Sequence, residues 1–301
     1  MKPALRYLLV WLVFSLILLS AVASLNLLID PYSLFRVVDV EGLNHVKSRA
    51  SQRGETFKRS AAERMHPNGL ILGNSQAEIG FDPHSPAWLT EARPIFNLAL
   101  PGRGIQSGLK VFSDLLKHAR PGLVVVGLEF LDFRADSSAE YAAQAAEPAE
   151  AVRRLREQIS LLTVDVLADS LATLMAQRNP YSASLTETGF NPMRDYLAIA
   201  RNEGYHAMFM QRNRENASAF VRGPKSIYLA DGKLPEDFAA VRAMVKIASE
   251  RSIPLRLVIY PYHSHTLVLF HQTRLWPAFE AWKTELVKIL ELAPVGSDIE
   301  L

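Results

Sequence analysis

Cysteine is absent from the 301 residues of this sequence. Disulfides, thiolate metal sites and cysteine nucleophiles are therefore excluded. A large charge excess is absent as well, because 33 basic and 31 acidic residues leave a net charge of +2. The two surplus positive charges are Lys2 and Arg6, so residues 30–301 carry no net charge. Without a basic field, the sequence gives no indication of nucleic-acid binding.

Fingerprints of cofactor and metal sites are also lacking. Gly102-Arg-Gly104 and the pair Gly122 and Gly127 do not have the spacing of a dinucleotide-binding or P-loop motif. His263 and His265 lie two residues apart in a proline-containing loop, but a metal site needs at least a third ligand. The sequence therefore predicts neither a cofactor nor a metal site.

A long apolar run stands near the N-terminus. Tyr7 to Leu25 is an uncharged stretch of 19 residues, and it continues through Ile29 before Asp30. A helix over residues 7–29 can cross the ~30 Å hydrocarbon core of a bilayer. Positive charges before the run and an acidic residue after it predict a cytoplasmic N-terminus and an exported remainder.

The expected location is therefore the cytoplasmic (inner) membrane, crossed once, with the main domain on the periplasmic side. The alternative is a cleaved signal peptide, since Ala21-Val22-Ala23 offers a small-x-small cleavage site. The apolar run continues past Ala23, which favours an uncleaved signal anchor.

Three segments are distinguished by composition and periodicity. Residues 1–29 form the anchor, residues 30–68 form a neck or linker of mixed, solvated charges, and residues 69–301 form an α/β domain. Within this domain, residues 134–231 lose the α/β pattern and are interpreted as a largely helical insertion, with 180–222 polar and irregular.

Short apolar runs bounded by Pro and Gly predict buried strands that alternate with amphipathic helices. The expected strands are 70–72, 94–98, 123–128 and 255–260, and the expected helices are 105–118, 235–251 and 276–292. This alternation predicts a parallel sheet. No further strand is expected after the last helix, which ends at Pro294 and Gly296.

Each predicted strand is followed by polar or turn-forming residues. Parallel strands bring such residues to one edge of a sheet, where open α/β sheets bind ligands. They are Ser75 after the first strand, Asn97 and Gly102 after the second, Glu129 and Asp132 after the third, and Tyr260, His263 and His265 after the fourth.

Ser75, in Gly73-Asn74-Ser75, occupies a natural position for a nucleophile. The backbone N–H groups of Ser75 and Gly102 suit an oxyanion hole. The simpler interpretations are that Ser75 is an ordinary turn residue and that Asp132 is a surface or capping residue.

At these positions the chain resembles the SGNH (GDSL-like) hydrolase and acyltransferase superfamily. The resemblance lies in Gly73-Asn74-Ser75, in the Asn97–Gly102 segment and in Gly127. Within the superfamily, the chain more closely resembles the membrane-anchored extracytoplasmic branch related to alginate O-acetylation proteins. The resemblance covers roughly residues 69–133 and 253–292 and implies a three-layer, flavodoxin-like parallel sheet.

The resemblance implies Ser75 as nucleophile and Gly102 as an oxyanion-hole donor. Two departures stand out. The third block offers Glu129 and Asp132 where the family has an asparagine, and no Asp-x-x-His follows Ile253 to supply the base. Three interpretations stay open: the chain is C-terminally truncated, or His263 or His265 is the base with Asp132 orienting it, or the fold is catalytically silent.

The expected function is serine-dependent ester hydrolysis or O-acyl transfer on a cell-envelope glycan. The alternative is a non-catalytic envelope-assembly or glycan-binding protein that keeps the fold. The expected partners are the lipid bilayer through residues 7–29, an envelope glycan and membrane partner proteins.

Overall fold

The computed structural model describes residues 3–135 and 159–301. Contacts divide the chain into two compact units. The anchor unit contains the described residues of Met1–Ala61 and Glu147–Leu185, and the sheet unit contains those of Ala62–Ala146 and Thr186–Leu301. Part of the predicted insertion, residues 136–158, lies outside the described residues.

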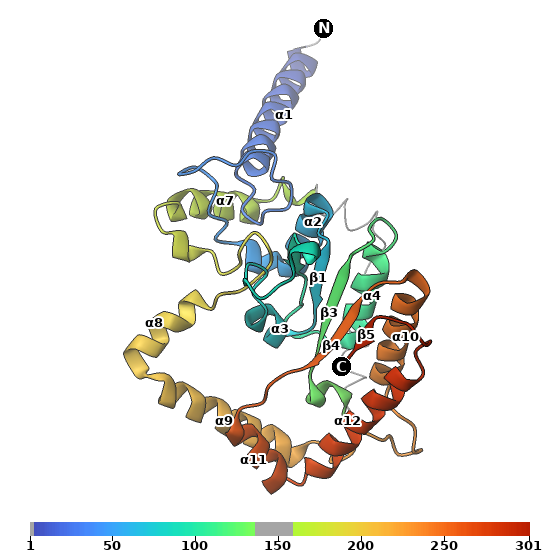
Figure 1. Cartoon of the computed structure of the whole chain (residues 1–301). Helices are drawn as coiled ribbons and strands as arrows, with labels where there is room; N and C mark the ends of the chain where they lie inside the picture. Colours follow the sequence, from blue (N-terminus) through green and yellow to red (C-terminus); the bar gives the residue numbers. More distant parts are fainter. Residues whose placement is uncertain (1–2, 136–158) are drawn as a thin grey trace. The chain divides into compact units, whose positions relative to one another are not determined.

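The sheet unit is built on a five-stranded, entirely parallel sheet (Figure 1). The strand order is β2-β1-β3-β4-β5. The strands are β1 (Gly69–Leu72), β2 (Ile95–Asn97), β3 (Leu123–Leu128), β4 (Leu255–Ile259) and β5 (Ile299–Glu300). This is the flavodoxin-like order. Strand β2 is added on one side of β1, and β3, β4 and β5 are added on the other side, so the order of addition reverses between β1 and β3. The predicted α/β class and parallel sheet are confirmed.

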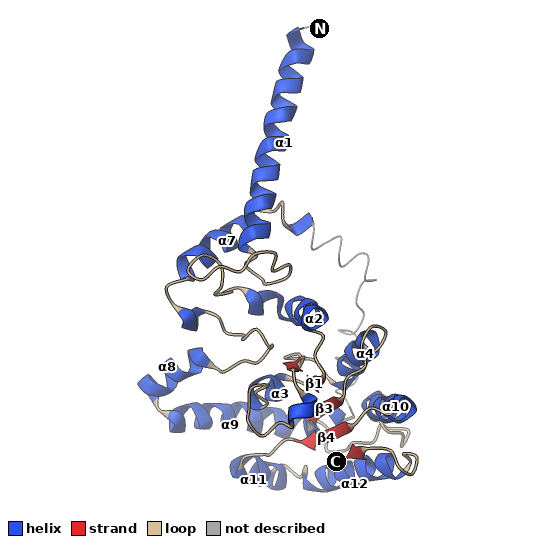
Figure 2. Cartoon of the chain, turned by 45° about the horizontal axis from the view of Figure 1, so that its top comes forward, coloured by secondary structure: helices blue, strands red, loops and turns tan. Residues whose placement is uncertain are grey.

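Helices connect the strands and cover the sheet (Figure 2). Those of the sheet unit are α3 (Ser75–Gly80), α4 (Ile105–Leu115), α8 (Arg194–Glu203), α9 (Tyr205–Arg222), α10 (Glu236–Arg251), α11 (Ser264–Gln272) and α12 (Trp276–Glu291). Short 3₁₀ helices cover Thr90–Ala92 and Phe130–Phe133. Right-handed crossovers place α4, α10 and α12 on one face of the sheet, and α10 contacts both of the others.

The core of the sheet unit is built around the strands. All four residues of β1 and the last five of β3 are buried, as expected for a parallel sheet covered on both faces. Trp282 on α12 is fully buried and packs against Phe130 and Phe133, with ring centroids 5.6 and 5.7 Å away. Trp282 therefore belongs to the core that α12 buries against the end of β3.

Three segments differ from the expectation. Residues 180–222, predicted to be irregular, contain α8 and α9, because this stretch is polar but rich in helix-forming Ala, Arg and Glu. The loop after β4 continues into α11 rather than remaining open. A fifth strand, β5, pairs with β4 where no strand was expected, and Arg256 holds it through ion pairs with Asp298 (2.7 Å) and Glu300 (3.1 Å).

The anchor unit begins with α1 (Pro3–Ile29), the one described helix that is long and apolar enough to span a membrane. It also contains α7 (Val164–Ala176), the 3₁₀ helices Ala50–Arg53 and Pro180–Ser182, and the first part of α2 (Gly54–Met65), which continues into the sheet unit. The side chains of α1 between Tyr7 and Leu19 are mostly exposed and apolar on all sides, as in a lipid-facing helix.

The neck between α1 and the sheet unit was predicted to be a solvated linker, and the structure corrects this. Lys47, Lys58 and Arg59 are buried. Buried cations require polar partners, and Lys47 donates from Nζ to the carbonyl of Ile29 (2.8 Å), while Arg59 forms an ion pair with Glu55 (3.0 Å). These three basic residues of the neck therefore belong to a folded structure rather than to a free surface.

Candidate functional site

Ser75 lies where β1 turns into α3. Asn74 caps this helix, because its side-chain Oδ1 accepts from the N–H of Gln76 (3.0 Å). Ser75 is the first residue of α3 and is exposed. No described residue hydrogen-bonds to its hydroxyl group. The strand–turn–helix arrangement leaves the hydroxyl accessible at the carboxyl edge of the sheet.

Gly73 permits this turn. Its φ of +144° lies in a region that residues with a side chain rarely adopt. A Cβ atom there would also lie 2.6 Å from the Tyr260 hydroxyl oxygen and 2.8 Å from the Ala77 Cβ. Glycine is required at this position by the backbone conformation and by the packing together.

The residues after β3 contact the turn after β1. Gln76 donates from Nε2 to Glu129 Oε2, and Asn74 donates from Nδ2 to Asp132 Oδ2 (3.5 Å). Glu129 and Asp132 are both buried. These contacts lie where the strand order reverses between β1 and β3, which is the usual ligand-binding position of a doubly wound sheet.

Glu129 is the titratable centre of this arrangement. Tyr262, from the segment after β4, donates its hydroxyl hydrogen to Glu129 Oε1 (2.7 Å) and accepts from the N–H of Phe130 (2.8 Å). Burial raises the pKa of Glu129 to about 7, although hydrogen bonds from Tyr262 and the Leu131 backbone act in the opposite direction. Burial and the nearby Glu129 raise the pKa of Tyr262 well above its ordinary value.

Tyr260 fills the space between the ends of β1 and β3. Its ring packs against Gly127, where an added Cβ atom would overlap the ring. The side chain is buried, and its hydroxyl group has no hydrogen-bond partner of good geometry among the described residues. Burial also raises the pKa of Tyr260, so the phenol is neutral at physiological pH.

Asn97 is the last residue of β2 and Gly102 follows the strand, and the two residues lie in different environments. Asn97 is fully buried; its Nδ2 donates to the carbonyls of Ala77 and Phe81 (both 2.9 Å), and its Oδ1 accepts from the N–H of Ala99 (3.1 Å). Its amide thus holds the C-terminal end of α3. Gly102 is exposed with a φ of +69°.

The two candidate histidines lie at the start of α11 and are exposed. His263 caps this helix, because its Nδ1 accepts from the N–H of His265 (3.2 Å), and its ring stacks on Phe209 of α9 with centroids 5.3 Å apart. The Nδ1 of His265 lies 3.0 Å from Nδ2 of Asn213. Within the described part of the chain, neither imidazole hydrogen-bonds to Ser75.

The structure thus joins Asn74, Gln76, Glu129, Asp132 and Tyr262, whereas the histidines contact α9. Gln76 and Tyr262 were missed by sequence reasoning. A signal for Tyr262 was present, because Tyr260 and Tyr262 alternate after a buried strand and both follow its carboxyl end. Gln76 carries no such signal, since its role depends on the position of Glu129.

Fold and site together define an α/β protein with a polar, partly buried site at the switch point of a parallel sheet. Comparison with protein-family models, with curated proteins and with solved structures found no match. The resemblance to the SGNH superfamily therefore stays a prediction.

Proposed function

We propose that this chain is a membrane-anchored extracytoplasmic enzyme that uses Ser75 as a nucleophile on an acyl ester. The observation that supports this most directly is the exposed Ser75 hydroxyl at the switch point, on a turn fixed by Asn74 and linked to Glu129 through Gln76. A strand–turn–helix position presents a serine hydroxyl to substrate while the sheet keeps its backbone rigid.

The reaction would begin with attack of Ser75 Oγ on the ester carbonyl carbon, and the serine proton would pass to a base. The proposal assigns this proton to His263, which Asp132 would orient. The ring of His263 stacks on Phe209, so the assignment requires the side chain to rotate away from that ring. The N–H groups of Ser75 and Gly102 would stabilise the oxyanion.

Collapse of the tetrahedral intermediate would release the alcohol, which takes the proton from the base and leaves an acyl-serine. Water or a sugar hydroxyl group would then accept the acyl group, giving hydrolysis or O-acyl transfer. We propose an envelope glycan as the substrate, because the positive charges of Lys2 and Arg6 before the apolar run favour export of the segment that follows this run. In this proposal α1 crosses the cytoplasmic membrane once, with its N-terminus inside.

The test combines covalent labelling with turnover. A fluorophosphonate probe should label the full chain in detergent and fail to label Ser75→Ala, while Ser218→Ala, a change at another exposed serine, should label normally. Hydrolysis of an activated acyl ester should fall about 10²–10⁴-fold in His263→Ala if this residue is the base. The same loss in His265→Ala alone would move the base to that residue.

One observation favours a second candidate function. Because no described residue hydrogen-bonds to the Ser75 hydroxyl, the fold also suits a non-catalytic glycan-binding or envelope-assembly protein. Absence of probe labelling, together with equal trace turnover in the parent chain and Ser75→Ala, would reject the enzyme and leave this candidate. Retained binding of an acylated glycan by Ser75→Ala would then support it.

A further inference from the structure

The last turn of α1 is built into the anchor unit. Asn44 donates from Nδ2 to the carbonyl of Leu28 (2.6 Å), and Lys47 donates to the carbonyl of Ile29 (2.8 Å). These side chains satisfy carbonyls that a helix end leaves without partners. Asn26 is also buried, donating to the carbonyl of Leu161 (2.8 Å) and accepting from the hydroxyl of Ser170 (2.8 Å).

The length of α1 sets where this turn lies in a bilayer. About 20 helical residues cross the ~30 Å hydrocarbon core. Counted from Tyr7, the first residue after the charged Arg6, such a span ends at Asn26. The turn from Asn26 to Ile29, with the residues bonded to it, therefore falls at the boundary between acyl chains and headgroups.

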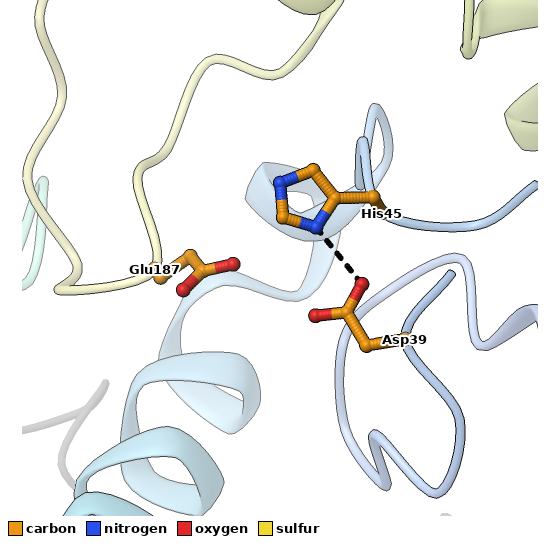
Figure 3. Close-up of side chains that lie close together, drawn as sticks. All are labelled: Asp39, His45 and Glu187. Carbon is orange, nitrogen blue, oxygen red and sulfur yellow. Dashed lines mark hydrogen bonds and ion pairs between the residues drawn. The ribbon is translucent and has the colours of Figure 1, made fainter. Parts of the chain in front are cut away.

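A loop beside this turn exposes apolar side chains. Val37, Val40 and Leu43 are 63%, 45% and 44% exposed. The loop is held firmly, because Asn44 Oδ1 accepts from the N–H of Val40 (2.7 Å) and His45 Nδ1 lies 2.9 Å from Asp39 Oδ1 (Figure 3). The exposure therefore belongs to a fixed conformation, not to a loose segment.

Helix α7, which contacts α1, exposes a second apolar surface. Its buried side, with Val166, Ser170 and Thr173, faces the unit's interior. Residues Val164, Leu171 and Met175 recur at helical spacing on the opposite side and are 78%, 48% and 77% exposed. Contiguous exposed apolar surface in a soluble setting is unfavourable and usually indicates a contact surface.

We propose that these two surfaces, which we call the apolar collar (Val37, Val40, Leu43, Val164, Leu171 and Met175), sit in the lipid headgroup–acyl boundary on the exported side. The collar would seat the anchor unit on the bilayer in addition to the single span. The inference rests on the proposed anchoring by α1. Lipid is the occupant because the loop and the helix that carry these surfaces are both attached to the turn of α1 that lies at that boundary. The loop is attached through Asn44, and α7 is attached through Ser170 and its packing on α1.

The absence of cysteine permits a direct test. Single-cysteine variants of the full chain, labelled with an environment-sensitive NBD dye, are reconstituted in phosphatidylcholine vesicles, and quenching is measured with 5-doxyl lipid and with aqueous iodide. Val40→Cys, Val164→Cys and Leu171→Cys report on the collar. Asp165→Cys, an exposed polar neighbour of Val164, is the matched control, and Leu16→Cys reports on the span.

The expected result is that doxyl lipid lowers the emission of the collar probes by at least about twofold while iodide has little effect, with the reverse at Asp165. Iodide quenching of the collar probes with Leu16 quenched by lipid would overturn the collar and leave the anchor intact. Quenching of the collar probes by neither agent would show a protein partner or a second copy there, which also overturns it. A Leu16 probe open to iodide would reject the anchor itself, and the collar with it.

Discussion

The carboxyl group of Glu129 offers the sharpest test of the candidate site. It is buried and accepts hydrogen bonds from Gln76 and Tyr262. Replacing it by glutamine in Glu129→Gln keeps the shape of the side chain and removes the ionisation. The amide of Gln76 can turn to present its oxygen, so the replacement side chain need not leave a buried group without a partner.

The pKa of Glu129 sets the size of the expected change in stability. Its ordinary value is 4.5, and burial raises it to about 7 in the folded chain. Between these values the folded state binds more protons than the unfolded state, so the free energy of unfolding falls as pH rises. At about 1.4 kcal/mol for each pKa unit, the parent chain should lose about 3 kcal/mol between pH 4.5 and pH 7. The Glu129→Gln variant should not show this pH-dependent loss in the free energy of unfolding.

The assay is urea unfolding of the full chain in detergent at several pH values, followed by tryptophan fluorescence, for which Trp282 is a buried reporter in the sheet unit. Glu129→Gln should match the parent chain near pH 4.5 and exceed its stability by about 3 kcal/mol near pH 8. Glu250→Gln, at a 61%-exposed side chain, should stay within about 0.5 kcal/mol throughout. A stability difference that is the same at pH 5 and pH 8 would falsify the reasoning.

Two further changes test the packing and the neck. Gly127→Ala places a methyl group into the ring of Tyr260 and should lower the free energy of unfolding in urea by about 3 kcal/mol. Gly108→Ala is the control, because the nearest atom to its added Cβ is 3.5 Å away, and it should raise the free energy of unfolding by about 0.5–1 kcal/mol. Equal effects of the two changes would contradict the packing of Tyr260 on Gly127. Asn44→Ala should destabilise the anchor unit by about 1–3 kcal/mol because the carbonyl of Leu28 loses its donor. Limited proteolysis should then cut between residues 34 and 47, and unchanged resistance would show that this contact is dispensable.

Much of the sheet was predictable because buried parallel strands are continuous apolar runs ended by turn residues. The predicted strands at 70–72, 123–128 and 255–260 agree with β1, β3 and β4 within a residue or two. The strand β5 could not be predicted, because its two residues, Ile299 and Glu300, form no apolar run and depend on pairing with β4.

Part of the candidate site could likewise be predicted from the sequence, and part could not. Parallel strands fix the edge at which Ser75, Glu129 and His263 lie, and that could be read from the order of strands and turns. The hydrogen bond from Tyr262 to Glu129 and the stacking of His263 on Phe209 could not. The first depends on how the segment after β4 packs against the end of β3, and the second on how α9 packs against the start of α11; such tertiary contacts leave no local pattern in the sequence.

The hydrogen bonds that fix the end of α1 have a mechanical consequence. A flexible tether would let a membrane helix tilt without disturbing the domain attached to it, but Asn44, Lys47 and Ser170 make the helix and the anchor unit turn together. Helices tilt more in thin bilayers, where their apolar length exceeds the hydrocarbon thickness. In a membrane-anchored chain, the thickness of the surrounding bilayer would therefore set the angle at which the anchor unit stands to the membrane plane.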